Sequence, residues 1–167
     1  MRGAGRETTN GVRSETTRGP SHVSRPAPRA PPMLSGLLES SLYVADLDRA
    51  AAFYVRLLDG EVLLADERMR AVSVAGRQVL LLFLAGASDR DNPVPGGVVP
   101  PHDGRGRLHV AFAAAGGSLG AWEERLAALG VAVESRVHAP RGGTSLYFRD
   151  PDGHLVELAT PGIWTVY

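Results

Sequence analysis

Residues 144–160 read TSLYFRDPDGHLVELAT, and this stretch predicts a β-hairpin. Two strand-like runs, Thr144–Arg149 and His154–Thr160, flank the turn sequence DPDG. A proline followed two residues later by a glycine fits such a corner, because proline presets its own φ and glycine tolerates the left-handed region. The chain is therefore expected to double back at Pro151. His154 directly follows the turn and is expected to face water.

Glu157 is a carboxylate within an otherwise apolar strand. Side chains alternate between the two faces of a strand, so Glu157 shares a face with Leu155 and Ala159. A charge in that setting needs a partner, and a metal ion is one of the few partners that offset the desolvation of a carboxylate. The alternative is a half-exposed strand in which Glu157 is hydrated. The hairpin alone leaves both interpretations open.

The same order of elements occurs twice in the chain. A strand over Leu37–Val44 and a helix over Leu47–Leu58, capped by Asp46, begin the first unit. A strand over Leu108–Ala113 and a helix capped by Ser118 begin the second. Three more strands are expected in each unit: Glu61–Ala65, Met69–Val74 and Gln78–Leu84 in the first, and Val131–Val137, Thr144–Arg149 and His154–Thr160 in the second.

The spacing of landmarks supports a duplication. Glu39 and His109 are separated by 70 residues, and so are Gly60 and Gly130, which are expected to supply the left-handed stops of the two helices. Glu39 and His109 thus take equivalent places in the first strands of the units. Glu157 lies on the last strand of the second unit, and its counterpart in the first falls on Leu81.

Three side chains of metal-ligand type therefore arrive at related points of a duplicated sheet. Each is a weak signal alone, since a single histidine on an apolar strand is more often a satisfied core residue than a ligand. Together, Glu39, His109 and Glu157 favour a shared site over three unrelated polar residues.

Length and composition exclude several classes of function. A chain of 167 residues can bury one core without disulfides, and the absence of cysteine removes thiolate metal sites and cysteine nucleophiles. All 18 basic residues are arginine, so Schiff-base chemistry on a lysine is also excluded. A net charge of zero gives no indication of nucleic-acid binding, and no apolar run approaches the length of a membrane span. These features predict a cytoplasmic protein.

Composition also sets the expected boundaries. Residues 1–32 carry six arginines and two glutamates without an aromatic residue or a hydrophobic period, which predicts a disordered tail. The domain is expected over residues 33–167. Its parts are a first module at 37–84, a linker or lid at 85–105, a second module at 106–160 and a C-terminal tail at 161–167.

The chain resembles the vicinal oxygen chelate superfamily, which includes glyoxalase I, extradiol dioxygenases, fosfomycin-resistance enzymes and bleomycin-binding proteins. The matching stretches are LYVADLDRA at residues 42–50 with Phe53 and Tyr54, LHVAF at 108–112, and YFRDPDGH at 147–154 running into Val156, Glu157 and Leu158. The resemblance implies an α+β fold of two βαβββ modules, whose curved mixed sheet forms a cup around a divalent metal. It also implies a homodimer, and some members build the cup across the dimer.

Carried over by position, the resemblance places the metal ligands at Glu39, His109 and Glu157. It implies a divalent ion, Fe, Mn, Ni, Zn or Mg, that binds a small substrate through two adjacent oxygens for lyase, isomerase or dioxygenase-like chemistry. Glyoxalase I-like members use a further carboxylate where this chain has Leu81. Extradiol dioxygenases have a histidine where this chain has Glu39, so the set here is richer in oxygen.

Further side chains near the hairpin are candidates for catalysis or substrate binding. Tyr147 could donate a proton to a developing oxyanion beside Glu157, or fill the cup wall. His138 could act as an acid or base, and Arg141 could bind an anionic group, although both lie on an expected loop. Ser41 shares a strand face with Glu39 and is a candidate substrate contact.

A function of another class fits the same features. Members of this superfamily also act as metal-free binding proteins that sequester an antibiotic, as bleomycin-resistance proteins do. Bound metal, lost on substitution of His109 or Glu157, would distinguish the enzyme from the binder.

Overall fold

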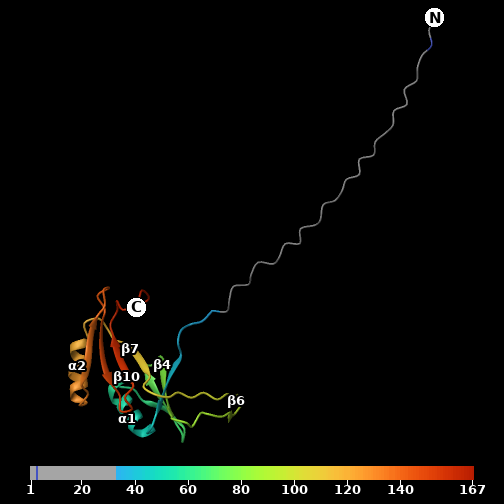
Figure 1. Ribbon diagram of the computed structural model, residues 1–167, viewed down its shortest axis with the longest axis horizontal. Coiled ribbons are helices and arrows are strands. Elements are labelled where there is room, and N and C mark those ends of the chain that lie inside the picture. The colour runs from blue at the N-terminus through green and yellow to red at the C-terminus, as the bar shows by residue number, and fades with distance from the viewer. Residues whose placement is uncertain (1–2, 4–32) are drawn as a thin grey trace. The chain divides into compact units, whose positions relative to one another are not determined.

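The computed structural model describes residue 3 and residues 33–167, and the compact unit runs from Ser35 to Tyr167 (Figure 1). It is an α+β protein with two four-stranded sheets, as the duplication predicts. The expected disordered tail at residues 1–32 lies outside the described residues, apart from Gly3. The elements are β1 (Glu39–Val44), α1 (Leu47–Leu58), β2 (Val62–Ala65), β3 (Met69–Val74), β4 (Gln78–Leu84), β5 (Asn92–Val94), β6 (Gly97–Val99), β7 (His109–Ala113), α2 (Leu119–Ala128), β8 (Val133–His138), β9 (Thr144–Arg149) and β10 (Leu155–Ala159).

The two sheets have the same topology. The first has strand order β1-β4-β3-β2 and the second β7-β10-β9-β8, so β1 and β7 are free edge strands. In each sheet the first strand pairs in parallel with the last, and the other pairings are antiparallel. Both modules are therefore βαβββ units in which the helix makes the crossover.

Strand register confirms the expected counterpart of Glu157. Ser41 pairs with Leu81 in the first sheet, and Ala111 pairs with Glu157 in the second. These pairs lie two residues beyond the strand positions of Glu39 and His109, respectively. Leu81 and Glu157 are thus equivalent, and the first module has an aliphatic side chain where the second has a carboxylate.

Helix α1 begins where the sequence predicts but ends differently. The Asp46 side chain accepts hydrogen bonds from the backbone N–H groups of Asp48 and Arg49, which caps the helix. The left-handed stop is Asp59, with φ of 53°, and not Gly60. Gly60 serves close packing instead, because a Cβ there would lie 2.4 Å from the carbonyl oxygen of Ser73.

Helix α2 lacks the predicted side-chain cap. The Ser118 hydroxyl donates to the carbonyl of Ala115, 2.7 Å away, and so does not accept from the first turn of the helix. Leu126 anchors the helix in the core, while Trp122 is only half-buried. The amphipathic pattern placed this helix correctly because its position depends on the apolar stripe more than on the cap.

The linker at 85–105 contains secondary structure that composition did not indicate. Strands β5 and β6 form a short antiparallel hairpin that extends away from the two larger sheets (Figure 1). Local turn chemistry at Gly96, where φ is 97°, supports this hairpin.

One hydrophobic core contains residues of both large sheets and of both helices. Alternation directs every second strand residue into this core and the others to the opposite surface, here called the outer face of each sheet. On strands β1, β3 and β4, the outer face of the first sheet carries Glu39, Ser41, Tyr43, Met69, Ala71, Ser73, Val79, Leu81 and Phe83. On strands β7, β9 and β10, that of the second carries His109, Ala111, Ala113, Ser145, Tyr147, Arg149, Leu155, Glu157 and Ala159.

The DPDG turn joins the two modules. Its Asp150 accepts a hydrogen bond from the Tyr54 hydroxyl of α1 at 2.9 Å, and its Asp152 accepts from the Ala45 N–H at 2.8 Å. His154 is 2% exposed, which corrects the expectation that it faces water. It contacts the N–H of Leu108 and the carbonyl of Tyr43, so a position that looks like a loop end is an internal contact between modules.

Within the part of the chain that the structure describes, no helix has the length and apolarity that crossing a bilayer requires.

Candidate metal and substrate site

His109 and Glu157 form the centre of the candidate site on the outer face of the second sheet. They lie on the paired strands β7 and β10, and His109 Nε2 is 3.2 Å from Glu157 Oε2. The Glu157 residue is 7% exposed, whereas the His109 side chain is 48% exposed. The Glu157 carboxylate is therefore largely removed from solvent, and the more exposed imidazole of His109 lies against it.

Backbone and side-chain contacts fix the orientation of both groups. His109 Nδ1 lies 3.1 Å from the carbonyl oxygen of Leu155, which can only accept, so we assign the Nδ1 proton to this bond. The lone pair of Nε2 then points at Glu157. The Ser145 hydroxyl donates to the other carboxylate oxygen, Oε1, through a short hydrogen bond.

This arrangement fits a proton or a metal ion between the two groups. A neutral Nε2 lone pair and a carboxylate repel each other at 3.2 Å, unless a proton or a metal ion lies between them. Metal-binding histidines usually donate the N–H of the ring nitrogen that does not bind the metal to a backbone carbonyl or a carboxylate, and metal-binding carboxylates are usually hydrogen-bonded as well. His109 and Glu157 have both kinds of contact. The donor set therefore fits a divalent metal.

Tyr147 lies beside this pair on the neighbouring strand β9, directly opposite Glu157 in the register. Its ring centroid is 6.4 Å from that of His109. Burial raises the pKa of the Tyr147 phenol above its usual value of 10.0, the Ser145 hydroxyl opposes this, and the negative charge of Glu157 reinforces it. Tyr147 therefore keeps its proton at neutral pH.

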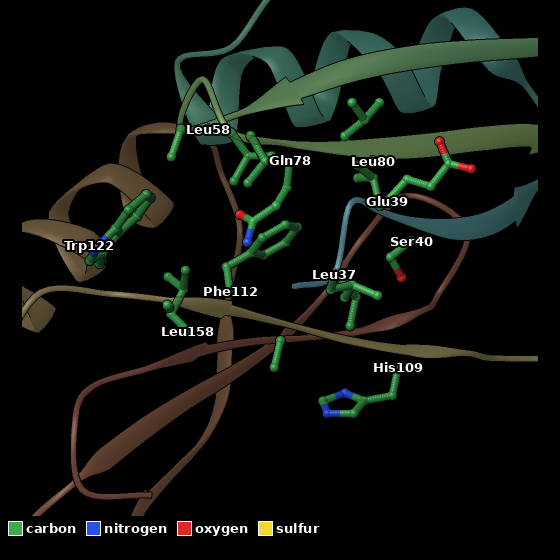
Figure 2. A pocket seen from close by; sticks show the side chains of 16 residues that line it. Leu37, Glu39, Ser40, Leu58, Gln78, Leu80, His109, Phe112, Trp122 and Leu158 are labelled. Carbon is green, nitrogen blue, oxygen red and sulfur yellow. The ribbon is translucent and has the colours of Figure 1, made fainter. Parts of the chain in front are cut away.

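The structure does not bring Glu39 to His109 and Glu157 within one chain. Glu39 lines the same cavity of about 480 Å³ as His109, between the two modules. Figure 2 shows its carboxylate and the imidazole of His109 on opposite sides of that cavity, pointing away from each other. Among residues 33–167 no group of three histidine or acidic side chains is close enough to hold a metal.

The remaining predicted side chains lie apart from the His109–Glu157 pair. Ser41 is on the outer face of the first sheet, opposite Leu81. His138 is paired with Thr144 at the end of β8, and its Nδ1 is 3.0 Å from the Thr144 hydroxyl. Because Thr144 and Ser145 point to opposite faces, His138 lies on the face that does not carry Glu157. Arg141 is exposed in the turn between β8 and β9.

Sequence reasoning missed the role of Ser145 as the hydrogen-bond partner of Glu157. The two residues lie on the same face of neighbouring strands, two residues out of direct register, because Ser145 is opposite Ala159. Ser145 is 1% exposed, and a buried hydroxyl on a strand needs a hydrogen-bond partner. The sequence did not reveal this role, because burial cannot be read from one sequence.

Comparison with known proteins places this fold and site in a family. Residues 36–158 match the family model described as the Glyoxalase/Bleomycin resistance protein/Dioxygenase superfamily. The chain belongs to this superfamily. The match spans both modules and includes all three candidate metal ligands.

Curated members of the superfamily resemble the chain at moderate identity. It is 30% identical over 122 residues to the metallothiol transferase FosB of Bacillus licheniformis, covering 72% of each chain. It is 28% identical over 130 residues to FosB of Shouchella clausii, covering 77% of this chain and 82% of that protein.

Solved structures of the superfamily share the architecture. Lactoylglutathione lyase from Agrobacterium tumefaciens is 32% identical with a TM-score of 0.71, covering 79% of this chain and 98% of the other. The fosfomycin resistance protein FosX from Listeria monocytogenes, in complex with Mn(II) and sulfate, is 25% identical with a TM-score of 0.57, covering 77% and 91%. The superfamily thus includes metal-containing members with the same fold.

Proposed function

We propose that the protein is a homodimeric, metal-dependent enzyme whose divalent ion binds a small substrate through two adjacent oxygens. The observation that carries this proposal is the His109–Glu157 pair, whose 3.2 Å contact fits a metal ion or a proton between the groups and whose outer contacts orient both groups toward each other. The similarity to FosB, FosX and lactoylglutathione lyase supports the same class of chemistry.

The third ligand in this proposal is Glu39 of the partner subunit. His109 and Glu157 supply two donors, and Glu39 of the same chain points away from them (Figure 2). Strands β1 and β7, which carry Glu39 and His109, are both free sheet edges in a single chain. Packing β1 of one chain along β7 of another would cover these edges and bring the two halves of a cup together.

The ligand set defines what the metal would do. Two carboxylates and one neutral imidazole balance the charge of a divalent ion, which favours Mn, Mg, Zn or Ni in a Lewis-acid role over oxygen activation by iron. When bound, the ion would polarise vicinal oxygens of the substrate and stabilise negative charge that develops on them.

The chain's own side chains would orient the substrate and move protons. Ser145 holds Glu157 in one rotamer, so the carboxylate does not have to reorganise during the reaction. Tyr147 keeps its phenolic proton and can donate a hydrogen bond to a substrate oxygen next to Glu157. Ser41 would enter the same cup from the first module of the partner subunit.

A mixing experiment tests the proposal. Glu39→Gln and Glu157→Gln chains are purified separately, and each is expected to lose Mn²⁺ binding in equilibrium dialysis. When the two are mixed and allowed to exchange subunits, each heterodimer regains one complete site. Random exchange should restore about one quarter of the wild-type sites, because half of the dimers are mixed and each has one intact site of two.

The mixture also separates the alternatives. A site built within one chain would give no recovery on mixing, because each chain would lack one ligand. A wild-type protein that binds no Mn²⁺, Zn²⁺, Ni²⁺ or Fe²⁺ would favour the metal-free binding function. Glu134→Gln, which alters an exposed carboxylate paired with Arg149, is the matched control and should bind metal normally.

A further inference from the structure

Three rings gather on the outer face of the first sheet, at the end distant from Glu39. Tyr43 of β1 stacks on Phe83 of β4 with centroids 5.9 Å apart, and His102 packs edge-on against Phe83 at 4.6 Å. The Tyr43 hydroxyl lies 2.8 Å from His102 Nδ1. Phe83 is buried, whereas Tyr43 and His102 remain half-exposed. We call Tyr43, Phe83 and His102 the aromatic cluster.

The linker holds His102 in place. The His102 N–H donates to the carbonyl of Ser88 at 2.9 Å, which closes the base of the loop. Gly104 lies flat against the Tyr43 ring, since a Cβ at this position would be 2.3 Å from a ring carbon. The linker is therefore fitted to the sheet at Gly104 and His102.

The aromatic cluster continues the same surface as the proposed metal ligand. Glu39, Ser41 and Tyr43 are alternate residues of β1 and point to one face. Four residues of strand separate Glu39 from Tyr43, which corresponds to about 13 Å. The neighbouring positions on this face are mainly small or aliphatic: Ala71, Val79 and Leu81.

The charge of this surface limits what can bind it. Among the outer-face residues of β1, β3 and β4, Glu39 is the only acidic or basic side chain. Beyond these strands, Asp103 of the linker lies near Tyr43, where burial and then the charge of Asp103 raise the pKa of the phenol, and Asp103 pairs with Arg105 at 3.8 Å. A ligand that extends from the metal along β1 would therefore meet uncharged, mainly apolar side chains between its oxygen-bearing head and the aromatic cluster.

We propose that the aromatic cluster is a specificity subsite, which binds an aromatic or extended apolar substituent of a substrate whose vicinal oxygens bind the metal. The proposal rests on the proposed function for the head of the substrate, while the tail contacts depend on Tyr43, Phe83 and His102 alone. Tyr43 and His102 are the accessible members of the cluster, because Phe83 is buried and Gly104 lies against the Tyr43 ring, so an added aromatic ring would contact these two side chains. His102 Nε2 is free to contact a polar group near the end of the substituent.

A series of hydroxamic acids tests the subsite, because a hydroxamate binds a metal through two adjacent oxygens. The Mn²⁺-loaded dimer is titrated by calorimetry with acetohydroxamic acid, hexanohydroxamic acid and phenylhexanohydroxamic acid. We expect the phenyl compound to bind at least roughly tenfold more tightly than hexanohydroxamic acid, from burial and stacking of the ring. Phenylhexanamide, which lacks the chelating head, reports on the tail alone.

Single substitutions show which side chains cause the gain in affinity from the phenyl ring. His102→Ala should remove most of the gain from the phenyl ring and leave the affinity for acetohydroxamic acid unchanged. Tyr43→Phe keeps the ring and loses the bond to His102, so it should give an intermediate loss. Arg90→Ala, an exposed residue of the same linker, is the matched control and should bind all probes as the wild type does. Circular dichroism and thermal unfolding confirm that each variant is folded.

The outcomes separate this inference from the proposed function. If acetohydroxamic acid binds in a metal-dependent manner but the phenyl ring adds no affinity, the subsite is refuted and the metal site stands. If no hydroxamate shows metal dependence while phenylhexanamide binding depends on His102, the subsite stands and the metal proposal fails. Equal losses for all probes in His102→Ala would also refute the subsite.

Discussion

His154 connects the last hairpin of the second module to the first strand of the first module. Its Nε2 is 2.9 Å from the carbonyl oxygen of Tyr43, and its Nδ1 accepts the N–H of Leu108 at 3.0 Å. The neutral tautomer with the proton on Nε2 satisfies both bonds. This side chain therefore holds β1 and β7, the two strands that carry Glu39 and His109, to one turn.

We predict that His154→Ala destabilises the fold by about 2–4 kcal/mol, because it leaves a cavity and two unpaired backbone groups in a buried position. The free energy of unfolding in urea measures this loss. His138→Ala is the matched control, since this histidine is exposed and bonded to one hydroxyl, and it should change stability by less than about 0.5 kcal/mol. Similar losses for both variants would show that His154 is not an internal bridge.

The buried phenol of Tyr54 should make the free energy of unfolding depend on pH in the alkaline range. Burial, and then the charge and hydrogen bond of Asp150, raise the pKa of Tyr54 well above its usual value of 10.0. The unfolded chain releases this proton near pH 10 and the folded chain does not, so the stability from this group is complete below pH 10 and falls as the pH rises beyond it.

The measurement is the urea midpoint of the wild type and Tyr54→Phe between pH 8 and pH 11. The wild type should lose stability more steeply above pH 10, by about 1.4 kcal/mol per pH unit from this group. Tyr54→Phe should be less stable at pH 8, because it leaves Asp150 Oδ2 without the Tyr54 hydroxyl, and should have a flatter alkaline slope. Parallel curves would contradict the assignment.

Ser145 is expected to tune metal affinity without binding the metal. Its hydroxyl bonds Glu157 Oε1, and Glu157 Oε2 faces His109. Ser145→Ala should weaken Mn²⁺ binding by roughly tenfold, as the loss of a hydrogen bond behind a ligand does. Equilibrium dialysis measures the change. Ser145→Thr keeps the hydroxyl and should retain most of the affinity, whereas equal losses in both variants would indicate a packing effect.

Asp152 and Arg49 should contribute unequally to stability, although they form one ion pair at 3.0 Å. The Arg49 side chain is half-exposed, so Arg49→Ala should cost no more than about 1 kcal/mol. Asp152 also accepts the N–H of Ala45, and Asp152→Ala leaves that group unpaired, at a cost of about 1–3 kcal/mol. Thermal unfolding of the two variants compares these losses; equal effects would show that the ion pair dominates.

Much of the fold could be read from local patterns. The bounds of α1, β3, β4 and β9 agree with the sequence prediction, because apolar periodicity, the Asp46 cap and turn chemistry act over a few neighbouring residues. The duplication also paired Glu157 with Leu81, which the strand register confirms. The linker hairpin and the Asp59 helix stop were not predicted, since short strands and non-glycine left-handed residues leave weak signals.

The sequence by itself determined that two βαβββ units are present and that Glu157 lies on the strand face opposite Val156 and Leu158. The face of a strand on which a residue lies follows from its position alone, because successive side chains of a strand point to opposite faces. Tertiary structure alone decided that His109 meets Glu157 while Glu39 of the same chain does not, and that His154 is internal. These distances depend on how sheet edges and modules pack across a hundred residues of chain, and no local pattern encodes that packing.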